Sequence, residues 1–143
     1  MSVTLDKAMK VKCSSMKDFY YNWMHMLRFK HNLTKRQMQL AAEFLNLRHE
    51  LSDVIKDESV LEDITTSLES KKECRKRLNI KEDLFNVMWR RLKMSGFIVD
   101  GKINALYIPN ITANNYKLGL IFLIEDNVSA TTKQRTAENK GEQ

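Results

Sequence analysis

The stretch that most constrains the fold runs from residue 70 to residue 109, where two short helical patterns precede a hairpin signal. Ser70 and Glu73 have the spacing of a capping box, in which the two side chains satisfy free N–H groups at a helix start. Asn79 tolerates the left-handed backbone of a tight turn, and Ile80 can fill the corner that such a turn creates. The first helix is therefore expected to end in a sharp turn.

A second helix is expected to follow from Lys81. Phe85, Met88 and Leu92 recur at intervals of three and four, which places them on one apolar face. Gly96 supplies the residue type that adopts the left-handed conformation after a helix C-terminus. The pattern predicts a helix that packs by this face and ends just before Gly96.

A short β-ribbon is expected after this helix. Residues 97–99 and 102–108 are apolar runs, and Asp100-Gly101 between them is a strong signal for a two-residue hairpin turn. Helix, turn, helix and ribbon, in this order, make a winged helix. The sequence therefore predicts a mainly α protein with a small β wing, built on a winged helix-turn-helix core with an added N-terminal aromatic helix and a C-terminal strand.

The first helix of that core is expected after Thr34. Thr34 and Gln37 form a second capping-box pattern, and Leu33 and Met38 have the spacing of a hydrophobic staple. The apolar face expected on this helix is broad, which is typical of the central helix of a small domain. The residues expected on this face are Leu40, Phe44, Leu47, Leu51, Val54 and Ile55.

The N-terminal helix is expected to start at Ser15, a good N-cap residue. Helical spacing favours a buried stripe of Phe19, Trp23, Met26 and Lys30. The aromatic residues that lie off this stripe suggest packing against a second subunit, so we expect a homo-oligomer. The residues expected at its interface are Tyr20, Tyr21 and Phe29.

The chain is expected to have three parts. Residues 116–124 are a continuous apolar run, which predicts a strand that is buried on both faces, either as a third strand beside the wing or as a strand donated to a neighbouring chain. Beyond Val128 no aliphatic residue larger than Ala occurs, which is typical of a flexible tail. The predicted parts are an N-terminal arm with the aromatic helix (1–32), the winged-helix domain with its C-terminal strand (33–128) and a polar tail (129–143).

Positive charge is concentrated in the predicted helix-turn-helix. Residues 70–102 contain ten Lys or Arg and four Asp or Glu, so this segment alone carries a net charge of +6. Clustered bases bind nucleic acid by neutralising phosphates and releasing counterions, although a solvated Lys-rich face has the same composition. The candidate DNA-binding residues are Lys72, Arg75, Lys76, Asn86, Arg90, Lys93 and Lys102. Among them Asn86 is the side chain best placed to contact a base edge.

The sequence contains little that points to catalysis. The glycines form no phosphate-binding loop, and the histidines have no ligand spacing with Cys13 or Cys74. Adjacent acids such as Glu62-Asp63 point to different sides of a helix. We therefore expect that the protein is not an enzyme and that it binds no metal and no cofactor. No apolar run approaches the length of a membrane span, so we also expect a soluble, intracellular protein that does not enter membranes.

Several short motifs resemble a known group of proteins. They are SKKE (70–73), LNI (78–80), WRRLK (89–93), GFI (96–98) and INALYIP (103–109). Over roughly residues 33–110 the chain resembles small winged-helix proteins of tailed bacteriophages, including the crAss-like phages of gut bacteria. This resemblance implies a winged-helix fold and a location either in the cytoplasm of a bacterial host or in the virion.

Two functions remain open on this basis. The first is binding of duplex DNA, mainly through backbone charge. The second is a structural or assembly role in a phage particle, as a connector or ring protein that contacts other phage structural proteins. Glu82 and Asp83 count against reading of base sequence, because acids at the start of a recognition helix keep phosphate away.

Overall fold

The structure, a computed structural model of the chain, describes residues 11–111 and residue 124. The chain divides into two units at Pro109, and the elements named below belong to the first unit. The tail predicted over residues 129–143 lies outside the described residues, as does the strand predicted over residues 116–124 apart from Ile124. So do the first ten residues of the predicted arm.

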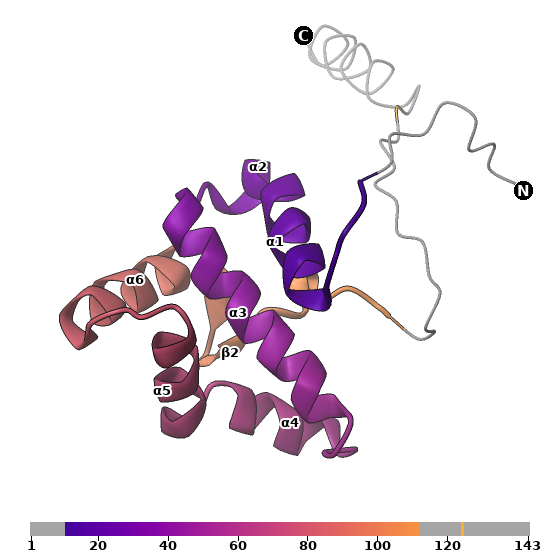
Figure 1. Cartoon of the computed structure of the whole chain (residues 1–143), viewed down its shortest axis with the longest axis vertical. Coiled ribbons are helices and arrows are strands. Elements are labelled where there is room, and N and C mark those ends of the chain that lie inside the picture. The colour runs from indigo at the N-terminus through magenta and orange to yellow at the C-terminus, as the bar shows by residue number, and fades with distance from the viewer. Residues whose placement is uncertain (1–10, 112–123, 125–143) are drawn as a thin grey trace, which may run out of the picture. The chain divides into compact units, whose positions relative to one another are not determined.

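The described part of the chain is mainly helical with a small two-stranded antiparallel sheet, as the sequence predicts (Figure 1). In chain order its elements are α1 (Met16–Met26), α2 (Arg28–His31), α3 (Lys35–Ser52), α4 (Glu58–Thr65), α5 (Leu68–Arg77), α6 (Glu82–Met94), β1 (Ile98–Val99), β2 (Lys102–Ile103) and the 3₁₀ turn η1 (Ala105–Tyr107).

Helix α3 is the central element. It begins with the expected capping box, in which the Thr34 hydroxyl accepts from the Gln37 N–H at 3.3 Å and the Gln37 Oε1 accepts from the Thr34 N–H at 3.0 Å. Leu33 and Met38, the predicted staple, are both buried. Helices α1, α4, α5 and α6 all pack against α3 (Figure 1). The core of this unit therefore forms around a single helix.

The C-terminal end of α3 differs from the prediction. The helix ends at Ser52, so Val54 and Ile55 lie in the turn that follows it. The N–H groups of Val54 and Ile55 both donate to the Leu51 carbonyl, at 3.1 and 2.8 Å respectively. This turn holds Val54 in solvent with 81% of its surface exposed. Val54 therefore does not belong to the buried face, because the helix that would have placed it there has already ended.

Aromatic rings join α3 to α6. The rings of Phe44 and Phe85 have centroids 6.5 Å apart, and that of Trp89 lies 5.3 Å from Phe44. Met88 and Leu92 are buried with them, which confirms the predicted face of α6. On the α3 side, Phe44 and Leu47 are buried as expected, whereas Leu51 is only half-buried because it lies in the last turn of the helix.

The buried face of α1 is rotated by one residue from the predicted stripe. Tyr20, Met24 and Leu27 are buried, while Met26 is exposed. The observed set has the same 4-3 spacing as the set Phe19, Trp23 and Met26, so periodicity alone does not separate them. The Trp23 indole lies at the edge of the core, where its N–H donates to the Tyr107 carbonyl at 2.9 Å. An indole N–H that leaves water needs such a hydrogen-bond partner.

The hairpin has the predicted turn and a shorter second strand. Ile98 pairs with Ile103 across a turn in which Asp100 and Gly101 both have positive φ, 53° and 76°, as a type I′ turn requires. The predicted strand over residues 102–108 is wrong beyond Ile103. The Asn104 side chain ends it, because its Oδ1 accepts from the Leu106 N–H at 3.0 Å and its Nδ2 donates to the Gly96 carbonyl at 3.0 Å.

His31 is a buried histidine of α2 that bonds both α1 and the connection before α3. Its Nε2–H donates to the Met24 carbonyl at 2.7 Å, and its Nδ1 accepts from the Leu33 N–H at 2.9 Å. These partners select the neutral tautomer, because protonated Nδ1 would face another donor. Burial lowers the pKa of His31; the bond to Met24 opposes this shift, and the positive charge of Arg28 adds to it.

We therefore expect the protein to lose stability as the pH falls below about 6.5, the ordinary pKa of histidine in the unfolded chain. The unfolded state then binds a proton that the folded state resists, so the free energy of unfolding falls by up to about 1.4 kcal/mol per pH unit until the folded pKa is reached. Melting temperatures between pH 8 and pH 5 measure this effect. His31→Gln should flatten the dependence and exposed His25→Gln should not; equal slopes in both variants would contradict the assignment.

Candidate nucleic-acid interface

The predicted DNA-binding residues lie on α5, α6 and the hairpin, and α5 starts earlier than expected. Its N-cap is Ser67, whose hydroxyl accepts from the Ser70 N–H at 3.3 Å. Ser70 is buried instead, and its hydroxyl donates to the Ile64 carbonyl. The capping box predicted for Ser70 and Glu73 is therefore wrong. Ser67 and Ser70 both have a side chain that can cap a helix. Ser67 takes this role because α4 ends at Thr65, so that Ser67 is the first residue after the C-cap of α4.

Helix α5 is held against α3 by a buried charge. Glu43 of α3 is 1% exposed, and its Oε1 lies 3.3 Å from Nη1 of Arg77 on α5. The same nitrogen lies 2.8 Å from the Glu50 carboxylate, and Arg77 Nε lies 3.4 Å from Glu73. Burial opposes the charged form of Arg77, but its hydrogen bonds to Glu50 and Glu43 outweigh this, so the pKa of Arg77 is raised.

Helix α1 also contributes to this cluster. Lys17 Nζ lies 3.2 Å from Glu43 Oε2, an oxygen that accepts no hydrogen bond from the described residues. The contact is therefore electrostatic, and the directed bond to Glu43 comes from Arg77. One carboxylate in the middle of α3 thus orients both α1 and α5.

Cys74 lies next to this cluster on the buried side of α5. Burial raises the pKa of its thiol, and the negative charge of Glu43 raises it further. The thiol therefore stays protonated at neutral pH, which removes the nucleophile and the metal ligand that a thiolate would supply. Within residues 11–111 and at residue 124, no group of three His, Cys, Asp or Glu is arranged to hold a metal ion.

The turn between α5 and α6 has the predicted residues in the predicted roles. Asn79 adopts the left-handed conformation with φ 51°. Ile80 is buried in the corner, and its N–H donates to the Arg75 carbonyl at 2.9 Å. Because this corner is closed by backbone bonds and a buried side chain, the position of α5 determines that of α6.

The seven candidate residues fall into two groups. Arg75 lies 3.9 Å from Glu82, and Lys102 lies 3.2 Å from Asp63 of α4, so these two are engaged within the chain. The other five are exposed, and among the described residues no ion pair involves them. On α5 these are Lys72 and Lys76, one turn apart, and on α6 they are Asn86, Arg90 and Lys93, which share one face.

Two features of α6 were not predicted from the sequence. Arg91 is exposed and adds a base beside Arg90. An apolar stripe of Leu84, Val87 and Met94 also faces solvent, and Met94 is 69% exposed. Their spacing of three and seven residues is helical and could have revealed a second apolar face on α6, separate from that of Phe85, Met88 and Leu92.

The three residues predicted at an oligomer interface lie in different environments. Tyr20 is buried inside its own chain, with its ring 6.0 Å from that of His49, so it offers no surface to a partner. Tyr21 is half-buried and stacks on the exposed His25 with ring centroids 6.3 Å apart. Phe29 of α2 is 66% exposed and is the one of the three that presents its ring to solvent.

Removing Arg77 should uncover the buried charge of Glu43. We expect Arg77→Met to lower the free energy of unfolding by about 2–4 kcal/mol, below the full cost of breaking a buried pair because the Arg77 side chain is 29% exposed. Urea denaturation measures the loss. Arg75→Met, which removes only an exposed pair, should cost at most about 1 kcal/mol. The double variant Glu43→Met/Arg77→Met should be more stable than Arg77→Met alone; if it is less stable, the buried charge is not the cause.

The comparisons with known proteins do not assign the chain to a family. No protein-family model matches it, and no curated protein or solved structure matches it either. In the part of the chain that the structure describes, no helix is both long enough and apolar enough to cross a membrane. The residues and their geometry are therefore the basis for a functional assignment.

Proposed function

We propose that the chain binds duplex DNA, mainly through the phosphate backbone, with α5, α6 and the β1–β2 hairpin acting as a winged helix-turn-helix. The order of these elements and the closed turn at Asn79 and Ile80 support this assignment. The resemblance of the same segment to winged-helix proteins of tailed phages is consistent with it. In this arrangement α6 is the helix that approaches the groove, and the hairpin is the wing.

The observation that carries the proposal is a set of exposed bases on two successive helices. Among the described residues no acidic side chain forms an ion pair with these bases, so their charge is available to phosphates. Each contact to a phosphate releases condensed counterions, which makes the binding favourable and dependent on salt. The bases are Lys72, Lys76, Arg90, Arg91 and Lys93.

Arg75 and Lys102 have a smaller role in this proposal than the sequence suggested. Their acidic partners, Glu82 and Asp63, are themselves largely exposed. Exposed pairs of this kind contribute about 0–1 kcal/mol, so a phosphate can replace the carboxylate. These two bases therefore add to binding only after their partners are displaced.

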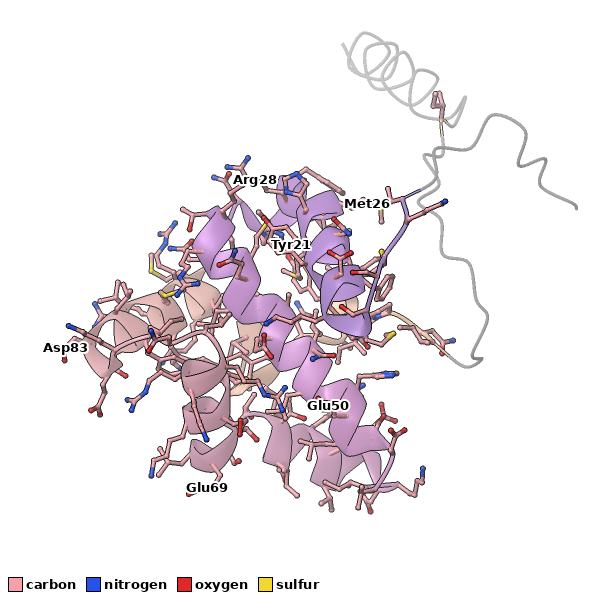
Figure 2. The ribbon with its side chains drawn as sticks, in the orientation of Figure 1. Tyr21, Met26, Arg28, Glu50, Glu69 and Asp83 are labelled. Carbon is pink, nitrogen blue, oxygen red and sulfur yellow. The ribbon has the colours of Figure 1, made fainter. Side chains whose placement is uncertain are left out.

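Shape and charge should count for more than base sequence. Asn86 is exposed on α6 and is the side chain best suited to an adenine edge. However, Glu82 and Asp83 occupy the first turn of α6, and Figure 2 shows Asp83 at the outer end of this helix. Acids at this position repel phosphate and limit how deeply the helix enters a groove. We therefore expect little discrimination between DNA sequences.

A second candidate function is a structural role in a phage particle. The observation that favours it is the exposed stripe of Leu84, Val87 and Met94, because apolar side chains on a helix surface are typical of protein contacts. In that case the neighbouring bases would face acidic patches on another subunit. Co-purification with capsid or portal proteins, without retention on DNA, would support this second candidate.

The DNA proposal predicts a specific effect for Arg90→Ala/Lys93→Ala. Two lost phosphate contacts should weaken duplex binding and lower the slope of log affinity against log salt by about two. Fluorescence anisotropy between about 50 and 200 mM salt measures both quantities. The matched control is Lys35→Ala/Lys56→Ala, which removes the same charge from exposed positions outside α5 and α6 and should leave the slope unchanged.

Two outcomes would reject this proposal. One is that the wild type fails to bind duplex DNA even at low salt. The other is that the Arg90/Lys93 variant and its control show the same affinity and slope, because binding would then depend on the total charge of the protein and not on the position of these bases. Either outcome would favour the second candidate.

A further inference from the structure

The two ends of α3 carry surfaces of opposite charge, each with exposed apolar side chains. Helix α3 has 18 residues, which at about 1.5 Å per residue separates its ends by about 27 Å. Figure 2 shows Arg28 near one end of α3 and Glu50 toward the other. Because a rigid helix separates these surfaces, neither can contact the other within one chain.

The basic surface lies around α2 and is termed the α2 end. It consists of Met26, Arg28, Phe29 and Lys30, all exposed. Between residues 25 and 36 the chain contains four Lys or Arg and no acid. Phe29 is 66% exposed, although burial of a ring this size is strongly favourable. The α2 end therefore combines exposed apolar side chains with positive charge.

The acidic surface lies where α3 gives way to α4 and is termed the α4 end. It consists of Asp53, Val54, Asp57 and Val60, all exposed. Between residues 53 and 63 there are five acids and one base, Lys56. The turn after α3 fixes Val54 in solvent, and the Asp57 carboxylate accepts from the Val60 N–H at 3.1 Å. The α4 end thus combines exposed apolar side chains with negative charge.

We propose that the α2 end of one copy binds the α4 end of another, so that the chain assembles head to tail. The exposed Phe29 and Met26 would pack against Val54 and Val60, with Arg28 and Lys30 facing Asp53 and Asp57. Opposite charges on the two surfaces favour this pairing and disfavour contact between two identical ends. None of the residues assigned to DNA takes part, so the contact does not depend on that assignment.

A contact between two different surfaces has a geometric consequence. Each copy offers one end of each kind, so binding at one interface leaves another pair of ends free. Such assemblies close into rings or grow into open chains, depending on the rotation between neighbours. They do not stop at a dimer, which distinguishes them from a contact between identical surfaces.

Two variants that each disable one end test the proposal. Phe29→Ser/Lys30→Ser removes the α2 end, and Asp53→Ser/Val54→Ser removes the α4 end; all four side chains are exposed, so the fold should persist. Sedimentation velocity at tens of micromolar measures the mass of each variant. Wild type should exceed the 16.8 kDa of one chain and dissociate as salt rises, while each variant alone should be a monomer.

An equimolar mixture of the two variants should give a dimer and nothing larger, because one intact interface joins them and both remaining ends are disabled. The matched control Leu106→Ser, which removes an exposed apolar side chain outside both ends, should assemble as wild type does. A monomeric wild type would overturn the proposal. So would assembly of either variant alone, or a mixture that stays monomeric. Circular dichroism of each variant verifies that it is folded.

Discussion

The buried carboxylate of Glu43 is the interaction on which the arrangement of helices depends. A charge that is 1% exposed on the buried face of α3 is costly unless cations reach it. Arg77 of α5 forms the hydrogen bond, and Lys17 of α1 adds a second positive charge. Three helices that are distant in sequence must therefore meet at one point, and the apolar core closes around that point.

The candidate interface follows from this constraint in two steps. Arg77 sets the position of α5 on α3, and the turn closed by Asn79 and Ile80 then sets the position of α6. Helix α6 buries Phe85 and its neighbours on one side, which directs Arg90 and Lys93 to solvent on another. A charge cluster inside the unit thereby determines which bases the surface presents.

Structural features that depend on one local sequence signal were predicted well. Where two local signals were equally good, the sequence did not show which of them the structure uses. The Thr34 cap, the Asp100-Gly101 turn and the left-handed Gly96 appear as expected because each depends on residues within a few positions. The prediction of the buried face of α1 was wrong by one residue, because the sets that begin at Phe19 and at Tyr20 have equal spacing. For the interface, five of the seven expected residues are exposed without an ion pair among the described residues, whereas Arg75 and Lys102 meet acids from other elements.

The sequence by itself determined the order of helices, the sharp turn at Asn79, the hairpin and the concentration of bases between residues 70 and 102. These features depend on backbone preferences and composition, which are properties of short segments. Only the tertiary structure decided that Glu43 is buried, that Lys102 pairs with Asp63, and that Phe29 and Val54 are exposed at opposite ends of α3. The physical reason is that burial and pairing depend on neighbours brought together by packing, and a single helical pattern contains no information about which neighbours those are.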